Sequence, residues 1–373
     1  MMRCPPVTYC TNIHPGEAWE DMAQAVMRHV PRVKAACAPT QPFPVGLRLS
    51  GQASRELDTA GARRFGSWLA GHGLYVATVN GFPYGRFHDT PVKSAVYRPD
   101  WRDPERQAYT LRLARLLACW LPEGETGSIS TVPLGFRREF PDADLPAAFA
   151  RLRRTLGDLV ALEEETGRHI RLAVEAEPGC LVETMEQMVR FFERLDPDPE
   201  KRRHLAVCYD CCHQALQFEE PEESLAHLSA AGIPVGHVQV SSALHLEGGD
   251  LSSLARFVEP VYLHQAVARR DDGSLLRFDD LPEALAAAPD GVSAWRVHFH
   301  VPVFVETLSE CASTQAFLRD ILPRFDKTAA LEVETYTWGV LPPELKTPEV
   351  TDSIIREIAW TEAARAARNG TDA

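Results

Sequence analysis

Five segments of the chain end in acidic, histidine or amide residues, spaced two apart in four of them, and each segment otherwise has the apolar character of a buried strand. Residues two apart on a strand point to the same face, so each pair lies on one side of its strand. Charged groups on a buried face are unfavourable unless something binds them. Carboxylate, imidazole and amide oxygen are ordinary metal ligands, so the pattern indicates a bound cation. The segments are RLAVEAE (171–177), LAVCYDCCH (205–213), VGHVQVS (235–241), WRVHFH (295–300) and ALEVETY (330–336).

The first two segments place acidic groups where a strand must stop. Pro178 and Gly179 follow Glu177 directly, so its carboxylate is expected at the end of the strand, with Glu175 one pleat deeper in a supporting position. Asp210 lies where the next strand turns toward a helix, a position at which Asp also serves as an ordinary N-cap. His213 three residues later adds a ligand or a substrate contact.

The later segments leave their register open by one pleat. Gln239 is a plausible oxygen ligand, but His237 shares its face, and either could contribute. Two carboxylates on one buried face would have raised pKa values or need partners, and Glu334 is favoured over Glu332 because it lies nearer the strand end. His298 and His300 alternate with apolar residues, so at least one of them is expected to face a ligand or substrate. The same role is expected of His264.

The bulk properties narrow the class of protein. The chain has 373 residues, of which 45% are hydrophobic and 24% charged, which is typical of a soluble globular protein. No apolar run approaches the roughly 20 residues that span a bilayer, so no membrane insertion is expected. The first residues lack an apolar signal region, which predicts a cytoplasmic location. A formal net charge of −13 disfavours nucleic acid as a partner, and nine cysteines do not form a disulfide scaffold at this length.

Short apolar runs alternate with longer amphipathic stretches, which predicts repeated βα units and a parallel sheet. Ten strands are expected, two more than a barrel needs, and the surplus falls between Leu244 and His300. There the stretch YLHQAVARRDDGSLLRF predicts a β-hairpin turning at Asp271-Asp272-Gly273. We therefore expect a single α/β domain over 1–373, a (β/α)8 TIM barrel with a rim elaboration over 244–294 and a C-terminal helix over 348–367. Polar residues collect after the strands, including Asn80 and Tyr84, which is where such barrels keep their chemistry.

These strand ends resemble those of the xylose isomerase-like TIM barrels, which include sugar-phosphate isomerases and epimerases and endonuclease IV. The shared features are Glu followed by Pro, then Asp-x-x-His, then Gln or His, then a final Glu. The resemblance implies a divalent metal (Mg, Mn or Zn) in a ring of four side chains, with Glu175 and Glu332 in a supporting layer. The implied ring consists of Glu177, Asp210, Gln239 (or His237) and Glu334.

Longer strings, such as YCTNIHPGEAW, VNGFPYGRFH, CYDCCHQALQFE and LEVETYTWGVLP, resemble the EboE family of metabolite-traffic TIM-barrel proteins. That resemblance implies a part in moving or processing a secondary-metabolite precursor together with other Ebo-cluster proteins.

The leading hypothesis is a metal-dependent isomerase or epimerase of a small hydroxylated or hydroxycarbonyl compound, in which Glu177 and Glu334 relay the proton. A binding or escort protein on the same barrel is the main alternative, because fold alone does not decide between them. An endonuclease IV-like phosphodiesterase is disfavoured by the acidic charge. The expected substrate contacts are His213, His298, His300, His264, Asn80, Tyr84 and His14.

Overall fold

Eight parallel strands form a nearly closed barrel in the computed structural model, which describes residues 5–248 and 250–367. A parallel bridge between Cys10 and Gly46 brings the first strand to the second at the seam. The predicted (β/α)8 barrel is therefore confirmed. In barrel order the strands are β1 (Thr8–Tyr9), β14 (Leu331–Val333), β7 (Val235–Val240), β6 (Leu205–Asp210), β5 (His169–Glu175), β4 (Thr126–Thr131), β3 (Leu74–Asn80) and β2 (Phe43–Arg48).

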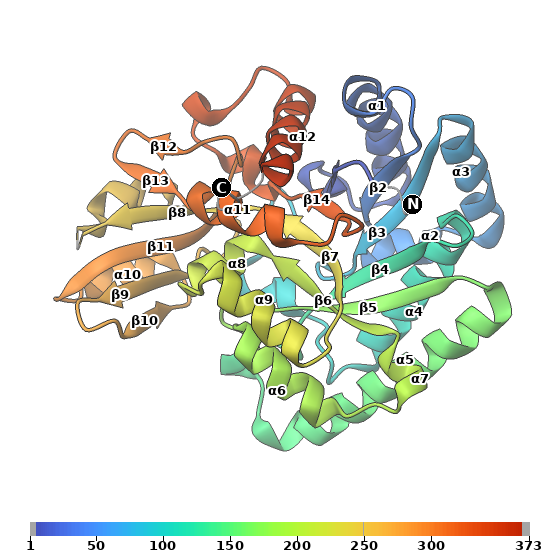
Figure 1. Ribbon diagram of the computed structural model, residues 1–373, viewed down its shortest axis with the longest axis horizontal. Helices are drawn as coiled ribbons and strands as arrows, with labels where there is room; N and C mark the ends of the chain where they lie inside the picture. Colours follow the sequence, from blue (N-terminus) through green and yellow to red (C-terminus); the bar gives the residue numbers. More distant parts are fainter. Residues whose placement is uncertain (1–4, 249, 368–373) are drawn as a thin grey trace, which may run out of the picture.

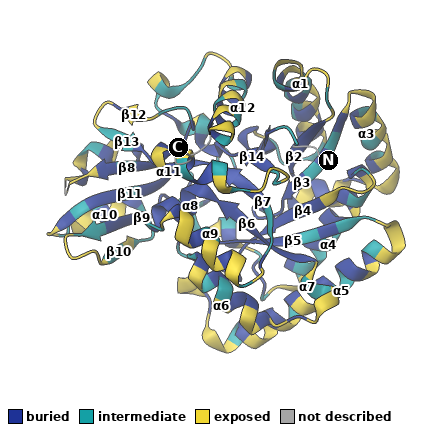
Figure 2. Cartoon of the chain, viewed as in Figure 1, coloured by how far each residue is buried: buried dark blue, intermediate teal, exposed yellow. Residues whose placement is uncertain are grey.

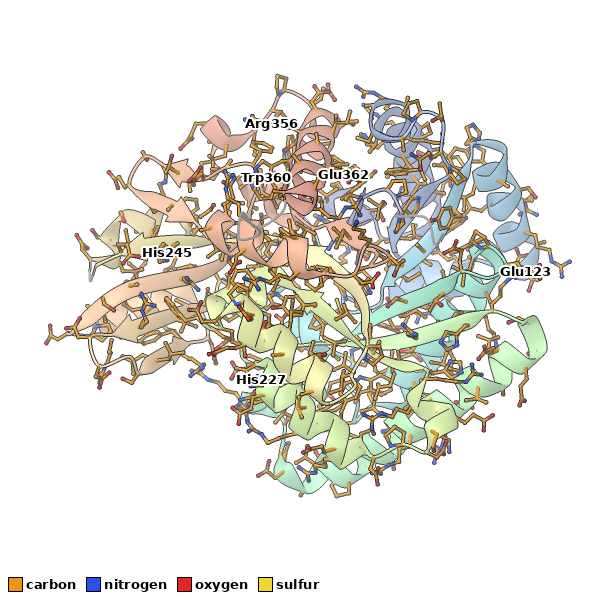
Figure 3. The ribbon with its side chains drawn as sticks, in the orientation of Figure 1. Glu123, His227, His245, Arg356, Trp360 and Glu362 are labelled. Atoms are coloured by element: carbon orange, nitrogen blue, oxygen red, sulfur yellow. The ribbon has the colours of Figure 1, made fainter. Side chains whose placement is uncertain are left out.

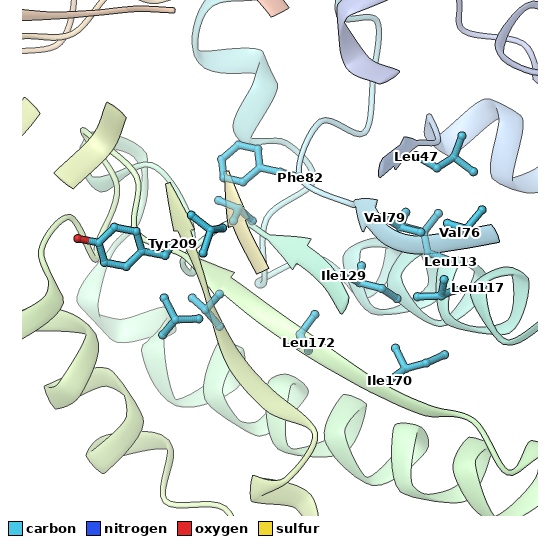
Figure 4. Close-up of a cluster of buried hydrophobic side chains, with 14 of the residues drawn as sticks. Leu47, Val76, Val79, Phe82, Leu113, Leu117, Ile129, Ile170, Leu172 and Tyr209 are labelled. Atoms are coloured by element: carbon cyan, nitrogen blue, oxygen red, sulfur yellow. The ribbon is translucent and has the colours of Figure 1, made fainter. Parts of the chain in front are cut away.

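Most of the helices surround the barrel and expose their outer faces, whereas the helix Leu281–Ala287 packs against a second sheet (Figures 1 and 2). On α4, Leu113 and Leu117 are one turn apart and belong to the same buried cluster as Val79 and Ile129 of the strands beneath (Figure 4). The helices are α1 (Trp19–Cys37), α2 (Gly51–Glu56), α3 (Thr59–Gly71), α4 (Pro104–Trp120), α5 (Leu145–Thr166), α6 (Met185–Leu195), α7 (Pro199–Arg202), α8 (Cys211–Leu216), α9 (Pro221–Ala230), α10 (Leu281–Ala287), α11 (Gln315–Ile321) and α12 (Val350–Ala366).

A second, antiparallel sheet is inserted between β7 and β14 and extends to one side of the barrel (Figure 1). Its core is formed by apolar side chains such as Leu244, Trp295 and Phe299. The predicted hairpin is present as β9 and β10, joined through Asp271 to Ser274. In sheet order the strands are β10 (Leu275–Phe278), β9 (Ala266–Arg270), β11 (Val292–Val301), β8 (Ser242–Glu247), β13 (Cys311–Ser313) and β12 (Thr307–Leu308).

The inserted sheet is larger than the sequence indicated. The range 244–294 falls inside it, but the sheet begins at Ser242 and continues to Ser313. WRVHFH lies on β11, so its histidines reach the barrel from an antiparallel strand of this sheet. Helix α12 lies within the expected range 348–367 and packs against α1. Among the helices of the described residues, none is both long enough and apolar enough to cross a membrane.

Candidate metal centre

Four carboxylates meet at the carboxyl ends of three barrel strands. Glu175 is the last residue of β5, Glu177 follows two residues later, Asp210 ends β6 and Glu334 follows β14 directly. All four are buried. Glu175, Asp210 and Glu334 each offer an oxygen, and these three oxygens lie within 4.8 Å of one another. The centre opens into a cavity that is lined by Glu175, Glu177 and Glu334 among other residues.

Burial and mutual repulsion make this cluster unfavourable when all its members are ionised. Burial, with repulsion from neighbouring carboxylates, raises the pKa values of Glu175 and Glu334 well above the ordinary value. Burial also raises the pKa of Glu177 to about 7, although the nearby His213 opposes the shift. Asp210 differs, because His213, His300 and Ser241 outweigh burial and lower its pKa. The cluster therefore holds protons unless a cation replaces them.

Two buried oxygens of the cluster have no hydrogen-bond partner: Oε2 of Glu175 and Oδ2 of Asp210. A buried polar atom without a partner is destabilising by about 1–3 kcal/mol, and a charged one by more. Both atoms belong to side chains of the three-carboxylate group. The donor set of this group, which is all oxygen, fits a divalent cation such as Mg²⁺ or Mn²⁺.

Neighbouring side chains fix the orientation of two of these carboxylates. Asn12 and Asn80 both donate to Oε1 of Glu334, at 2.7 and 2.9 Å. The Tyr97 hydroxyl donates to Oε1 of Glu177 at 3.1 Å. The sequence analysis missed Tyr97 as a functional residue because it lies in the segment between β3 and α4, where no strand or helix pattern singles it out.

Three imidazoles face the carboxylates from outside the barrel strands. His213 lies on α8 and His298 and His300 on β11. Nε2 of His298 lies 3.2 Å from Nε2 of His213 and 3.2 Å from Nε2 of His300. Nε2 of His213 also lies 3.3 Å from Glu177 Oε2 and 3.7 Å from Asp210 Oδ2. The arrangement places nitrogen ligands beside the oxygen ligands in one buried pocket.

His237, Gln239 and Glu332 lie in the barrel interior and do not line the cavity. The ring nitrogens of His237 contact Ser128 Oγ at 2.8 Å and Cys208 Sγ at 3.3 Å. Gln239 Oε1 accepts from the same Cys208 thiol at 3.2 Å. These contacts occupy the atoms that His237 and Gln239 were expected to offer to a metal.

Glu332, expected in the supporting layer, is completely buried and accepts a hydrogen bond from Thr78. Burial raises its pKa, although Thr78 and Cys10 oppose the shift. The carboxyl group fits only because Gly46 on β2 has no side chain, since a Cβ there would overlap it.

Three other predicted substrate contacts lie outside the cavity lining. His14 pairs with the Tyr9 hydroxyl at 3.0 Å and stacks on His29. The Tyr84 hydroxyl donates to Glu105 at 2.8 Å. His264 contacts the carbonyl oxygen of His298 and the carboxylate of Glu259, both at 2.8 Å, so it supports β11 from behind.

Gln265, next to His264, is the residue that reaches the centre: its Oε1 lies 2.7 Å from His298 Nδ1. The string YLHQAV contains evidence for this role. Neighbouring residues of an extended chain point to opposite faces, so Gln265 is expected to face the centre if His264 faces away from it.

The comparisons with known proteins agree with this architecture. The family model described as xylose isomerase-like TIM barrel matches residues 42–293, so the chain belongs to this family. No curated protein matches the sequence. Among solved structures, a xylose isomerase-like TIM barrel protein from Mycobacterium smegmatis in complex with magnesium has a TM-score of 0.52 at 12% identity, covering 97% of this chain and 98% of that one.

Two further structures show the same fold. The IOLI protein with a bound zinc atom has a TM-score of 0.50 at 12% identity, with 96% of this chain and 98% of that chain covered. D-psicose 3-epimerase in the presence of D-fructose has a TM-score of 0.50 at 10% identity, with 97% and 100% covered. At these identities the likeness concerns the fold alone.

Proposed function

We propose that the protein is a divalent-metal-dependent isomerase or epimerase of a small hydroxylated or hydroxycarbonyl compound. The observation that carries the proposal is the group of buried carboxylates with raised pKa values that open into one cavity at the barrel mouth. Relatives of this fold include an epimerase studied with D-fructose and proteins that hold magnesium or zinc. The cavity is lined by apolar and aromatic side chains with a few polar groups, which is typical of a site for a small molecule.

In this proposal Glu177 and Glu334 exchange the proton of a substrate carbon. They come from different strands, so they approach a substrate from different sides. A pKa near 7 lets Glu177 both accept and return a proton close to neutral pH. Asn12 and Asn80 both bind Oε1 of Glu334, which leaves Oε2 available to the substrate. A bound cation would polarise the substrate oxygens and stabilise the negative charge that develops as the proton leaves.

Aromatic side chains form part of the cavity lining. Phe87, Tyr262 and Tyr336 contact one another with ring centroids 4.9 to 5.3 Å apart. Lys93, also in the lining, is already bound to Asp280 and to the carbonyl oxygens of Glu259 and Tyr262. Because the Lys93 ammonium group already has these partners, it is not free to bind a phosphate, so we expect an unphosphorylated substrate.

The test is incorporation of solvent deuterium into a panel of ketoses and aldoses by the metal-loaded protein. Glu177→Gln and Glu334→Gln are expected to lower the exchange rate by at least about 100-fold, the lower range for loss of a general acid or base. Glu123→Gln is the matched control, because Glu123 is exposed and remote from the centre (Figure 3). Tight ligand binding without proton exchange in the wild-type protein would overturn the isomerase proposal.

The escort function is the second candidate, and the resemblance of long sequence strings to the EboE family supports it. In that case the barrel holds a secondary-metabolite precursor for other Ebo-cluster proteins in the cytoplasm. The deuterium experiment separates the two functions, because an escort protein binds its metabolite and leaves the carbon-bound protons in place.

A further inference from the structure

A separate group of possible metal ligands lies at the opposite end of the barrel from the carboxylates. It consists of Glu163 near the end of α5, His169 at the start of β5 and His204 directly before β6. Strand β5 runs from His169 to Glu175, so at about 3.3 Å per residue this group lies roughly 20 Å from the candidate metal centre. The two groups share no residue.

One nitrogen of this group is buried without a partner. The His204 side chain is completely buried, and its Nδ1 lies 2.8 Å from the carbonyl oxygen of Ile170. A carbonyl oxygen only accepts hydrogen bonds, so Nδ1 carries the hydrogen, and in the neutral ring Nε2 presents a lone pair. This Nε2 has no hydrogen-bond partner, although Oε2 of Glu163 lies 3.0 Å from it.

The contact between His204 and Glu163 has the geometry of two ligands and not that of a hydrogen bond. In a hydrogen bond the acceptor lies close to the N–H direction, whereas here Oε2 lies to one side of it. Two atoms that bind one cation are related in this way, because the cation lies along the lone pair and the second ligand lies at an angle to it. A proton on Nε2 would have no acceptor in line, so a cation accounts for the contact better.

His169 provides a third ligand atom. Its Nδ1 lies 3.2 Å from the same oxygen of Glu163, and the three ligand atoms all lie within 4.8 Å of one another. A tetrahedral cation with bonds of about 2.0–2.1 Å places its ligands about 3.3 Å apart, which is close to both measured contacts of Oε2. The His169 and Glu163 side chains are 19% and 20% exposed, so water can reach the fourth position.

We propose that Oε2 of Glu163, Nδ1 of His169 and Nε2 of His204 bind Zn²⁺, with water as the fourth ligand. Two imidazoles and one carboxylate favour Zn²⁺ over Mg²⁺ or Mn²⁺. The Ile170 carbonyl oxygen supplies the outer acceptor that metal-bound histidines have. The site joins the end of α5 to the starts of β5 and β6, at the end of the barrel that contributes to stability. The role of this cation is therefore structural.

Arg203 is the competitor of the cation. Its guanidinium group contacts both oxygens of Glu163, with Nη1 3.1 Å from Oε1 and Nη2 against Oε2. The Arg203 side chain is 47% exposed, so it can release Oε2 and turn into water at little cost. Removing its positive charge should therefore strengthen cation binding, which a purely structural ion pair would not do.

The experiment is a calorimetric titration of the chelator-treated full-length protein with Zn²⁺, in an Asp210→Asn background that weakens the centre at the barrel mouth. Adding His169→Gln is expected to lower the number of bound Zn²⁺ ions by one. Adding Arg203→Gln is expected to tighten the same site by up to about fivefold, the equivalent of one exposed ion pair. His227→Gln is the control, because His227 is an exposed histidine on α9 and should change neither quantity (Figure 3).

An unchanged number of bound ions in the His169→Gln protein, or an affinity that Arg203→Gln does not raise, would overturn the proposal. Circular dichroism checks that each variant is folded, and Arg203→Gln decides the question if His169→Gln does not fold. The outcome is independent of the isomerase function. Absence of deuterium exchange would leave this zinc site in place, and absence of zinc here would leave the isomerase function in place.

Discussion

Replacing Glu177 by Gln should stabilise the metal-free protein at high pH. The carboxyl group has a pKa of about 7 in the folded chain and 4.5 ordinarily. Because the folded pKa is raised, the stability from this group is fully present below pH 4.5 and is lost as pH rises through 7. At about 1.4 kcal/mol for each pH unit between the two values, the loss is about 3 kcal/mol. Gln remains neutral and avoids it.

Urea denaturation of chelator-treated protein between pH 4.5 and pH 8 measures this effect. Glu177→Gln and the wild-type protein should have similar free energies of unfolding at pH 4.5, and the variant should be more stable by about 3 kcal/mol at pH 8. Saturating cation should remove most of this difference, because a ligand at 100 times its Kd adds about 2.7 kcal/mol to the wild-type protein, and the variant, with one carboxylate fewer beside the centre, binds it more weakly. Glu123→Gln should show neither change. The burial argument is refuted if metal-free Glu177→Gln is no more stable than wild type at pH 8.

The remaining predictions concern metal affinity and packing. Gln265→Leu removes the acceptor that orients His298 and should weaken Zn²⁺ binding at the barrel mouth by about 10–100-fold in a calorimetric titration, whereas an unchanged Kd would contradict this orienting role. Asp210→Asn should retain the helix cap and the circular dichroism spectrum but lose high-affinity binding of the cation at the barrel mouth, and Asp210→Ala should in addition be less stable by about 1 kcal/mol in urea. Gly46→Ala should destabilise the protein by about 1–3 kcal/mol, because the new methyl group overlaps Glu332; wild-type stability would show that the barrel interior adjusts.

The barrel and the polar strand ends could be predicted because both depend on local patterns. Alternation of apolar strands with amphipathic helices predicted the (β/α)8 fold, which the structure confirms. The spacing of Glu332 and Glu334 predicted that they share a face, and both side chains are buried and accept hydrogen bonds from the same strand, Glu332 from Thr78 and Glu334 from Asn80 of β3. Period-two spacing needs no knowledge of distant residues, so it can be read from the sequence.

The partners of these side chains could not be predicted, because they depend on register between strands far apart in the chain. Cys208 is paired with His237 in the register of β6 and β7, and its thiol contacts the side chains of both His237 and Gln239. The sequence showed two candidate ligands without showing the thiol between them. Similarly, the string WRVHFH indicated that its histidines face something polar, but their approach to the barrel mouth depends on the antiparallel pairing of β11 with β8.

Asp210 shows why an N-cap and a metal ligand are not exclusive interpretations of one carboxylate. Its Oδ1 accepts from the His213 backbone N–H at 3.1 Å and from the Ser241 hydroxyl at 2.7 Å. These two bonds fix the plane of the carboxylate and leave Oδ2 buried without a partner. The cap at the same time begins helix α8 and so brings the His213 side chain into the centre. The capping interaction therefore positions both the unpartnered Oδ2 of Asp210 and the His213 imidazole. Oδ1 of Asp210 caps the helix, while Oδ2 of the same carboxylate faces the metal centre.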